Sequence, residues 1–492
     1  MKKNIFLIIG ILCSTFSGIH AQNDFDEWRK QSNQDFEAFK AKSEQEFRDF
    51  REKANAEFAE FMSRSWEEFN AFQGIPAPKP TEPVKPTTVK PETKPATDPL
   101  PFEQITPLPA PTPRPQPIAP IHTPAPETPA PTAVKPDFSF LFYNTEYKVR
   151  LDNTLRFSLA DVAEQNIAQA WKSLSGKSYD ALISDCLRLR DQLNLSDWAY
   201  MQLLKTISEK FLGKTSNEAV LLQMFILTQS GYKVRIARAN NRLALLIPFR
   251  QTIYEYVYLN INGMKYYVMN KELQRQPFYI CNQEFPKEQY FSWQTGQPKL
   301  AEKLSAPKTF ASIRYPEINA SIQTNQNLID FYNDYPLSSE WNLYAFTGLS
   351  ETVKQSLYPV LQRALAGKTK TEAAGMLLSF LQTTFNYQTD AEQFGYERPF
   401  FADENFFYPY NNCKDRAILY SILVKELLAL EVVLLHYPGH LATAVYFPEN
   451  VTGDYLTIDG KKFIVCDPTY IGASIGMAMD DCKQVRANVI KL

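Results

Sequence analysis

A proline-rich segment divides this chain into two parts that cannot share one regular element. Residues 75–136 hold 21 of the 34 prolines, interleaved with Thr, Ala, Lys and Glu. Proline fixes φ and has no backbone N–H to donate, so such a segment can enter neither a helix interior nor a central strand. We therefore expect an extended polyproline spacer in which His122 is solvated.

An eleven-residue aromatic repeat precedes this spacer. The interval places the aromatic rings on one face of a helix, which we predict over residues 22–74. An apolar stripe about 75 Å long, at 1.5 Å per residue, is not soluble without a partner. We expect self-association or docking on an envelope protein through this helix, and the alternative is that it folds back onto the chain's own globular part. The two aromatic series are Phe25, Phe36, Phe47, Phe58 and Phe69, and Trp28, Phe39, Phe50, Phe61 and Phe72.

The first 21 residues have the pattern of a secretory signal peptide. Lys2 and Lys3 precede an apolar stretch, and small residues follow it up to Ala21. We expect an exported protein, located in the periplasm, at the outer membrane or in the medium. No later apolar run is long enough to span a bilayer. With 52 basic and 54 acidic residues, the charge gives no reason to expect a nucleic-acid partner.

Few residues after this signal are suited to chemistry. An odd number of scattered cysteines argues against a dense disulfide framework. Only His122, His436 and His440 remain as histidines, and Pro438 and Gly439 break the helix that a histidine metal pair would need. Neither a phosphate-binding glycine loop nor a calcium loop is present, so we predict no cofactor and no metal. The remaining cysteines are Cys186, Cys281, Cys413, Cys466 and Cys482.

The globular part contains a weak internal repeat. Residues 216–249 align with residues 414–447, and the continuation YLNINGMKYYVMN aligns with YLTIDGKKFIVCD. Each continuation holds an Asn-Gly or Asp-Gly hairpin signal between alternating strands. We infer an α+β protein with two related units, residues 137–275 and 356–492. A β-rich connector, residues 276–355, is expected between them.

The segment NNCKDRA places a cysteine at the polar start of an apolar helix. Asn412 is a residue type that caps helices, so Cys413 is expected in the first turn. Unsatisfied N–H groups and the helix dipole there favour a thiolate. His440 opens a later strand and Asp467 ends another. A thiol, an imidazole and a carboxylate are the groups needed for a nucleophile, its base and the group that orients the base.

The motifs NNCKDRA, GHLATAVYF and CDPTYIGASIG resemble the transglutaminase-like superfamily, a papain-related fold of thiol enzymes, over roughly residues 356–480. The resemblance implies Cys413 as nucleophile, His440 as base and Asp467 as orienting carboxylate. It also places Asp415 at an acidic position that is commonly filled. Many microbial members look like peptidases or amide hydrolases, and some have no demonstrated activity.

The first unit lacks all three reactive groups. The alignment puts Thr215, Arg242 and Asn270 at the positions of the cysteine, histidine and aspartate. We interpret this unit as a degenerate transglutaminase-like copy, retained for packing or for shaping a substrate groove.

The segment PENVTGD, residues 448–454, puts a condition on the triad. A simple meander would leave His440 and Asp467 at opposite ends of their strands. His440 and Asp467 meet only under one of two conditions. Either the strands on both sides of residues 448–454 act as one interrupted strand, or residues 448–454 loop out of the sheet. For the oxyanion, we expect the Cys413 backbone N–H as donor, with Gln393 as a candidate second donor. Cys466 is expected in the core, or in a bridge to Cys482.

These patterns predict an exported thiol acyl-transfer enzyme. Its simplest activity is hydrolysis of amide bonds in peptides or cell-wall peptides through Cys413, His440 and Asp467. The alternative is a non-catalytic scaffold that presents a peptide groove and joins other envelope proteins through the aromatic helix.

Overall fold

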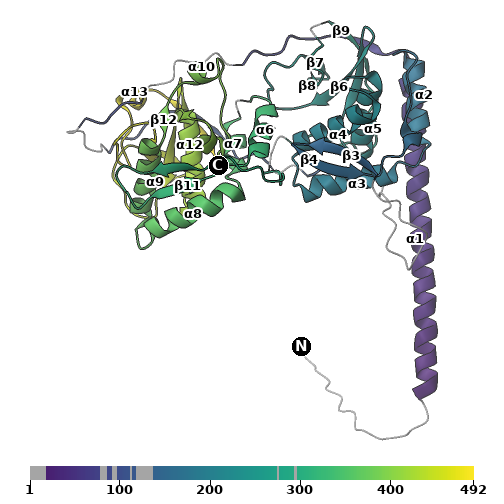
Figure 1. Ribbon diagram of the computed structural model, residues 1–492, viewed down its shortest axis with the longest axis horizontal. Helices are drawn as coiled ribbons and strands as arrows, with labels where there is room; N and C mark the ends of the chain where they lie inside the picture. Colours follow the sequence, from purple (N-terminus) through teal and green to yellow (C-terminus); the bar gives the residue numbers. More distant parts are fainter. Residues whose placement is uncertain are drawn as a thin grey trace, which may run out of the picture.

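The computed structural model describes residues 18–77, 86–90, 97–110, 113–117, 137–273, 276–292, 296–338 and 340–492. The fold is mixed α+β, as predicted. A teal unit and a green-yellow unit lie side by side, and a long helix projects from the body of the molecule (Figure 1). Most of the predicted signal peptide, residues 1–17, lies outside the described residues. None of the described helices combines the length and apolar composition needed to cross a bilayer.

The first unit is built on a six-stranded sheet with the order β1-β9-β5-β6-β8-β7. Helix α5 is buried from Ala219 to Gln229 because apolar residues lie on all its faces, and it packs between α4 and the sheet. The strands are β1 (Glu67–Asn70), β5 (Arg235–Ala239), β6 (Arg242–Pro248), β7 (Tyr258–Ile261), β8 (Met264–Val268) and β9 (Pro277–Cys281). The helices are α2 (Glu164–Ser175), α3 (Asp180–Gln192), α4 (Asp197–Leu212) and α5 (Asn217–Gln229), and β3 (Phe138–Phe142) and β4 (Thr145–Val149) form a separate hairpin.

The second unit has its own six-stranded sheet, with the order β2-β18-β14-β15-β17-β16. Helix α12 (Cys413–Leu428) packs between α9 (Lys370–Thr384) and strands β14 and β15. The strands are β2 (Phe102–Thr106), β14 (Glu431–Tyr437), β15 (His440–Tyr446), β16 (Tyr455–Ile458), β17 (Lys461–Cys466) and β18 (Ala487–Lys491). The remaining elements are α8 (Glu351–Leu365), α10 (Asp390–Gln393), α11 (Glu404–Phe407), α13 (Asp480–Lys483), and the short strands β12 (Asn386–Tyr387) and β13 (Tyr410–Asn411).

The two sheets have the same strand order, but the edge strand β1 runs antiparallel to β9, whereas its counterpart β2 runs parallel to β18. A buried helix precedes each, and the order of chain connections between the strands is the same in both. One connection differs greatly in length. Residues 213–216 join α4 to α5, whereas residues 385–412 join α9 to α12 and carry β12, α10, α11 and β13. The second unit therefore has extra chain next to the start of its buried helix.

The connector differs in part from the predicted β-rich segment. Its described residues include one hairpin, β10 (Lys308–Ala311) with β11 (Asn319–Ile322), two whole helices, α6 (Gln326–Asp334) and α7 (Trp341–Thr347), and the start of α8. Strand β9, which falls in the connector predicted from the sequence, belongs to the first sheet. Helix α6 forms because the Asn325 side chain caps it and its apolar residues lie on one face.

Helix α1 (Gly18–Met62) ends twelve residues before the predicted end at residue 74. The chain turns into β1 instead, because β1 pairs with the edge of β9. Phe58 is buried near the C-terminal end of α1, with its ring centre 4.8 Å from that of Trp171. Phe36 and Phe39 remain 62% and 70% exposed. The end of α1 thus folds back on the first unit, while its earlier turns present an uncovered aromatic face.

Where the structure describes it, the proline-rich segment is not a free spacer, contrary to our prediction; His122 lies outside the described residues. Three of its described parts, which we call the strap (residues 86–90, 97–110 and 113–117), run along both units (Figure 1). Strand β2 pairs with β18 at the sheet edge, and the Val89 N–H donates to Ile471 O at 2.9 Å. On the first unit, Arg190 Nη1 donates to Pro115 O at 3.0 Å. The sequence FEQIT has no proline, so its backbone N–H groups can pair with β18. An edge strand needs to form hydrogen bonds on one side only.

The strap contact at Gly231 gives a testable prediction. Gly231 has φ +89°, and a Cβ there would lie 1.9 Å from Gln116 O. Gly263 has φ +80°, but a Cβ there would meet no described atom within 4 Å. We expect Gly263→Ala to cost about 1 kcal/mol through backbone strain alone. Gly231→Ala should cost about 2 kcal/mol and expose residues 113–117 to limited proteolysis. Equal stability and equal cleavage of the two variants would contradict the strap.

Candidate active site

The three residues predicted as a triad occupy one place in the second unit. Cys413 is the first residue of α12, His440 the first of β15, and Asp467 follows the last residue of β17. His440 Nε2 donates to Asp467 Oδ2 at 2.7 Å. Asp467 Oδ1 accepts the Thr469 N–H at 2.8 Å, which fixes the carboxylate. The imidazole is therefore held by an oriented carboxylate, as a catalytic base would require.

Sheet order explains how His440 and Asp467 meet. Strand β15 pairs antiparallel with β17, and Thr443 lies opposite Cys466 in this register. Asp467 therefore continues β17 toward the start of β15. Strand β16 lies on the far side of β17, so residues 447–454 loop out between β15 and β16. The structure therefore meets the second condition stated from the sequence, in which the segment between the two strands loops out of the sheet.

The start of α12 is fixed by a capping box. Asn412 Oδ1 accepts the Lys414 N–H at 3.2 Å, and Asp415 Oδ2 accepts the Asn412 N–H at 2.9 Å. Asp415 also accepts the Phe400 N–H, at 3.1 Å. Burial raises the pKa of Asp415 to about 7, although Lys414 opposes the shift. Asp415 thus positions the cysteine through the backbone of the helix start.

The environment of His440 favours the imidazolium. Burial lowers the pKa of His440. The Asp467 carboxylate, and then the Cys413 thiol, raise this pKa by more than burial lowers it, so that it reaches about 10. Within the described chain, Nδ1 is buried without a well-formed hydrogen bond. Since Asp467 occupies Nε2, Nδ1 is the ring nitrogen left for interaction with Cys413. The Tyr437 ring stacks on the imidazole with centres 6.3 Å apart.

This raised pKa predicts how stability depends on pH. The folded pKa of His440 exceeds the ordinary value of 6.5, so the protonated ring stabilises the fold. That contribution should be complete below about pH 6.5 and disappear as the pH rises through about 10. We expect the stability difference between the wild type and His440→Gln, measured by urea unfolding, to shrink from pH 6 to pH 10. A difference that is constant over this range would contradict the buried imidazolium.

Buried ion pairs hold the loop that precedes α12. Lys414 is buried and pairs with Asp390, and its Nζ lies 2.7 Å from Glu397 Oε1. Asp390 also accepts from Asn412 Nδ2 at 2.7 Å and from the Arg398 N–H at 2.7 Å. The loop of residues 385–412 is thereby tied to the same capping residue that precedes the cysteine.

Tyr387 is a residue near Cys413 that sequence reasoning missed. Parallel pairing of β12 with β13 sets Tyr387 opposite Asn411, two residues before Cys413. Burial, and then the nearby Cys413 sulfur, raise the pKa of Tyr387. The Arg416 guanidinium lies 5.7 Å from its ring centre. The segment FNYQTD has no pattern that distinguishes this tyrosine from a core residue, so only the fold identifies it.

Other candidates lie outside the triad. Gln393 Nε2 donates to Tyr410 O at 3.2 Å, and no contact within the described chain places its side chain at Cys413. The His436 ring centre lies 5.5 Å from that of Trp341. Cys466 and Cys482 are buried free thiols, so the alternative of a bridge between them is not formed. Among the described residues, no group of three or more His, Cys, Asp and Glu side chains could hold a metal ion.

The first unit has a different set of contacts at the corresponding positions. Arg242 Nη2 donates to Thr215 O at 2.9 Å and pairs with Glu272 at 3.2 Å. Asn270 Oδ1 accepts the Leu245 N–H at 3.1 Å. These contacts hold strand ends together and supply no thiol or imidazole, so this arrangement cannot perform thiol chemistry.

No family model, curated protein or solved structure matches this chain significantly.

Proposed function

We propose that this protein is an exported thiol acyl-transfer enzyme of transglutaminase-like type, and most simply an amide hydrolase acting on peptides or cell-wall peptides. The observation that carries the proposal is the 2.7 Å bond from His440 to Asp467, beside the helix start that bears Cys413. Support also comes from Nδ1 of the same ring, which has no other partner among the described residues and can therefore interact with the Cys413 sulfur.

The geometry suggests a two-step reaction. His440 takes the proton of the Cys413 thiol, and Sγ attacks the amide carbonyl and forms a C–S bond. His440 then gives that proton to the leaving amine as the C–N bond breaks. Water then attacks the thioester, His440 accepts a proton from it, and the C–S bond breaks to release the acid. The backbone N–H of Cys413 has no acceptor within its helix and is the first oxyanion donor. We assign the Tyr387 hydroxyl as the second.

The substrate has little room to enter the closed site. Cys413 is 5% exposed, and His440 and Asp467 are less exposed still. Substrate entry therefore requires movement of the covering loops. The segment of residues 385–412 is our candidate, since it carries Tyr387 and borders the helix start.

Mass spectrometry of peptide reactions tests the proposal. Incubation with a mixed peptide pool should give products that gain one water, and the Cys413→Ala protein should give none. Loss of ammonia with joining of two peptides would indicate cross-linking instead of hydrolysis. No Cys413-dependent product of either kind would favour the scaffold.

We infer that the two units are related copies, the first of them degenerate. The common strand order, with a buried helix before each sheet, supports this inference. So does the match of the Asn262–Gly263 and Asp459–Gly460 hairpins, which have positive φ at all four residues.

A scaffold role is favoured by one observation, the uncovered face of α1. Phe36, Phe39, Phe47 and Phe50 are all exposed on it. We expect this face to cause self-association, because burying these four rings stabilises a contact by several kcal/mol. Light scattering should show a lower mass after Phe36→Ser and Phe39→Ser together. Arg29→Ser with Lys30→Ser is the matched control. An unchanged monomeric mass in the wild type and in both double variants would contradict self-association.

A further inference from the structure

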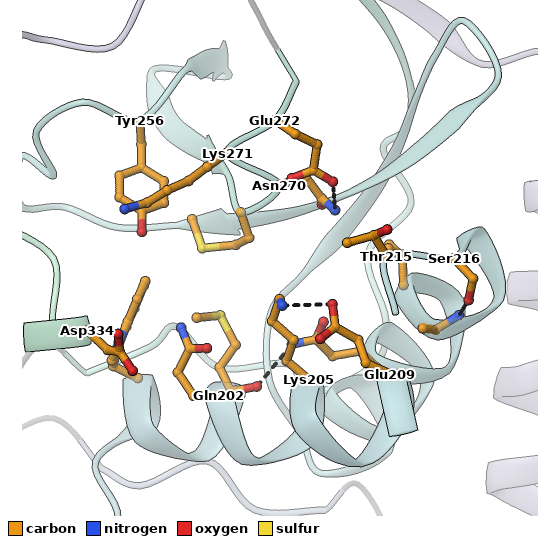
Figure 2. Close-up of a pocket in the computed structure, with 16 residues that line it drawn as sticks. Gln202, Lys205, Glu209, Thr215, Ser216, Tyr256, Asn270, Lys271, Glu272 and Asp334 are labelled. Atoms are coloured by element: carbon orange, nitrogen blue, oxygen red, sulfur yellow. Dashed lines mark hydrogen bonds and ion pairs between the residues drawn. The ribbon is translucent and has the colours of Figure 1, made fainter. Parts of the chain in front are cut away.

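The first unit contains a pocket at the place that corresponds to the triad. Thr215 and Asn270, the counterparts of Cys413 and Asp467, both line it. Figure 2 shows Tyr256, Lys271 and Asn270 on one wall, with Gln202 and Lys205 of α4 on the other. Its volume is about 310 Å³, within the range of small-ligand sites.

The chain length between two helices explains why this unit has room here. Four residues, 213–216, join α4 to α5. In the second unit, residues 385–412 lie against the helix start, where Asp390 accepts from the capping residue Asn412 at 2.7 Å and Tyr387 pairs opposite Asn411. The shorter connection leaves the helix start of the first unit uncovered on this side.

Several polar groups of the pocket have no partner within the described chain. The side chains of Gln202 and Thr215 make no hydrogen bond to any described residue. Figure 2 shows both beside the open space of the pocket. An amide N–H and a hydroxyl without partners beside an open space favour a ligand that carries acceptor oxygens.

Lys271 is the lysine of this pocket that forms no ion pair within the described chain. Glu209 pairs with Lys205 at 2.7 Å, and Glu272 pairs with Arg242 at 3.2 Å. Asp334 accepts from the Tyr143 hydroxyl at 3.1 Å, and its carboxylate also attracts Lys271 and Lys205 across the pocket without a direct ion pair. Lys271 makes no ion pair within the described chain, and its Nζ lies 4.7 Å from the Tyr256 ring centre. A carboxylate is the group that best complements this lysine.

We propose that this pocket binds a short peptide through a free carboxylate. The carboxylate pairs with Lys271, the peptide carbonyls accept from the unpaired donors, and an apolar side chain packs on Met201 and Met269. The inference deepens the proposed function and rests on it, because it names the ligand class that the degenerate unit contributes. The pocket would then recognise one part of a peptide whose amide bond reacts in the second unit.

Calorimetry with the full Cys413→Ala chain tests the pocket independently of turnover. The probes are tripeptides Ala-Ala-X, with X as Ala, Leu, Phe, Glu or Lys, each as free acid and as C-terminal amide. We expect at least one free acid to bind about tenfold or more tightly than its amide. Lys271→Met should remove this preference. The matched control is Lys265→Met, because Lys265 also lies over a tyrosine ring, at 5.3 Å from Tyr258, but outside the pocket.

The outcomes separate this inference from the proposed enzyme. The inference is supported if the preference for the free acid persists in Lys265→Met and is lost in Lys271→Met. This result would support the pocket whether or not the wild type hydrolyses peptides. Absence of binding by every free acid would overturn it, as would equal binding of acids and amides. An equal effect of the two lysine variants would assign the binding to general surface charge and overturn it as well.

Discussion

Cys413→Ala is expected to lower the rate of amide hydrolysis by about 10⁴-fold or more, because it removes the atom that forms the covalent intermediate of the proposed reaction. Cys413 begins α12 behind the capping residue Asn412, so alanine keeps both the helix and its cap. The rate of product formation from a peptide that the wild type cleaves measures the effect. Stability should change little, which urea unfolding of the same protein checks.

Two companion variants make this prediction sharper. His440→Gln should lower the rate by a similar factor, and the double variant should be no slower than either single one, since the two groups act as a unit. Cys186→Ala removes a buried thiol from the first unit and should leave the rate unchanged. Multiplicative effects of the two substitutions would argue that Cys413 and His440 work separately.

Lys414→Met is expected to lower the free energy of unfolding by about 3–5 kcal/mol, because it leaves the buried Asp390 carboxylate without its cation. Lys414 is buried beside the cysteine and holds both Asp390 and Glu397. The loss should appear in urea unfolding at neutral pH. It should be smaller at acidic pH, because burial already raises the pKa of Asp390 and protonation removes the unpaired charge.

A lysine on the same helix provides the control. Lys425 is only half-buried in the last turn of α12, and its Nζ lies 5.0 Å from the Phe346 ring centre. Lys425→Met should change stability by less than about 1 kcal/mol. If both variants are equally stable, the charges around Asp390 do not hold the helix start.

Local chemistry makes the candidate site predictable from sequence. Capping preference places Asn412 and Cys413 at a helix start, and alternation and proline place His440 and Asp467 at strand ends. The structure brings His440 and Asp467 into contact, and Cys413 is close enough to shift the histidine pKa. The hairpins at Asn262 and Asp459 are likewise predictable, because few residue pairs suit such tight turns.

Features that depend on distant partners could not be predicted in this way. Phe69 continues the helical repeat, but β1 finds a strand partner in β9, more than 200 residues away. Strand β2 joins β18 although prolines surround it. Tyr387 approaches Cys413 only through the pairing of β12 with β13. In each case a tertiary contact outweighs the local pattern.

Selective alkylation tests the central claim most directly, because all five described cysteines are buried and only one should react as a nucleophile. The wild type and His440→Gln would each be treated with iodoacetamide at less than one equivalent, and the labelled peptide identified by mass spectrometry. We predict labelling confined to Cys413 and strongly reduced by His440→Gln. Labelling of another cysteine at the same rate, or labelling of Cys413 that does not depend on His440, would contradict the proposed site.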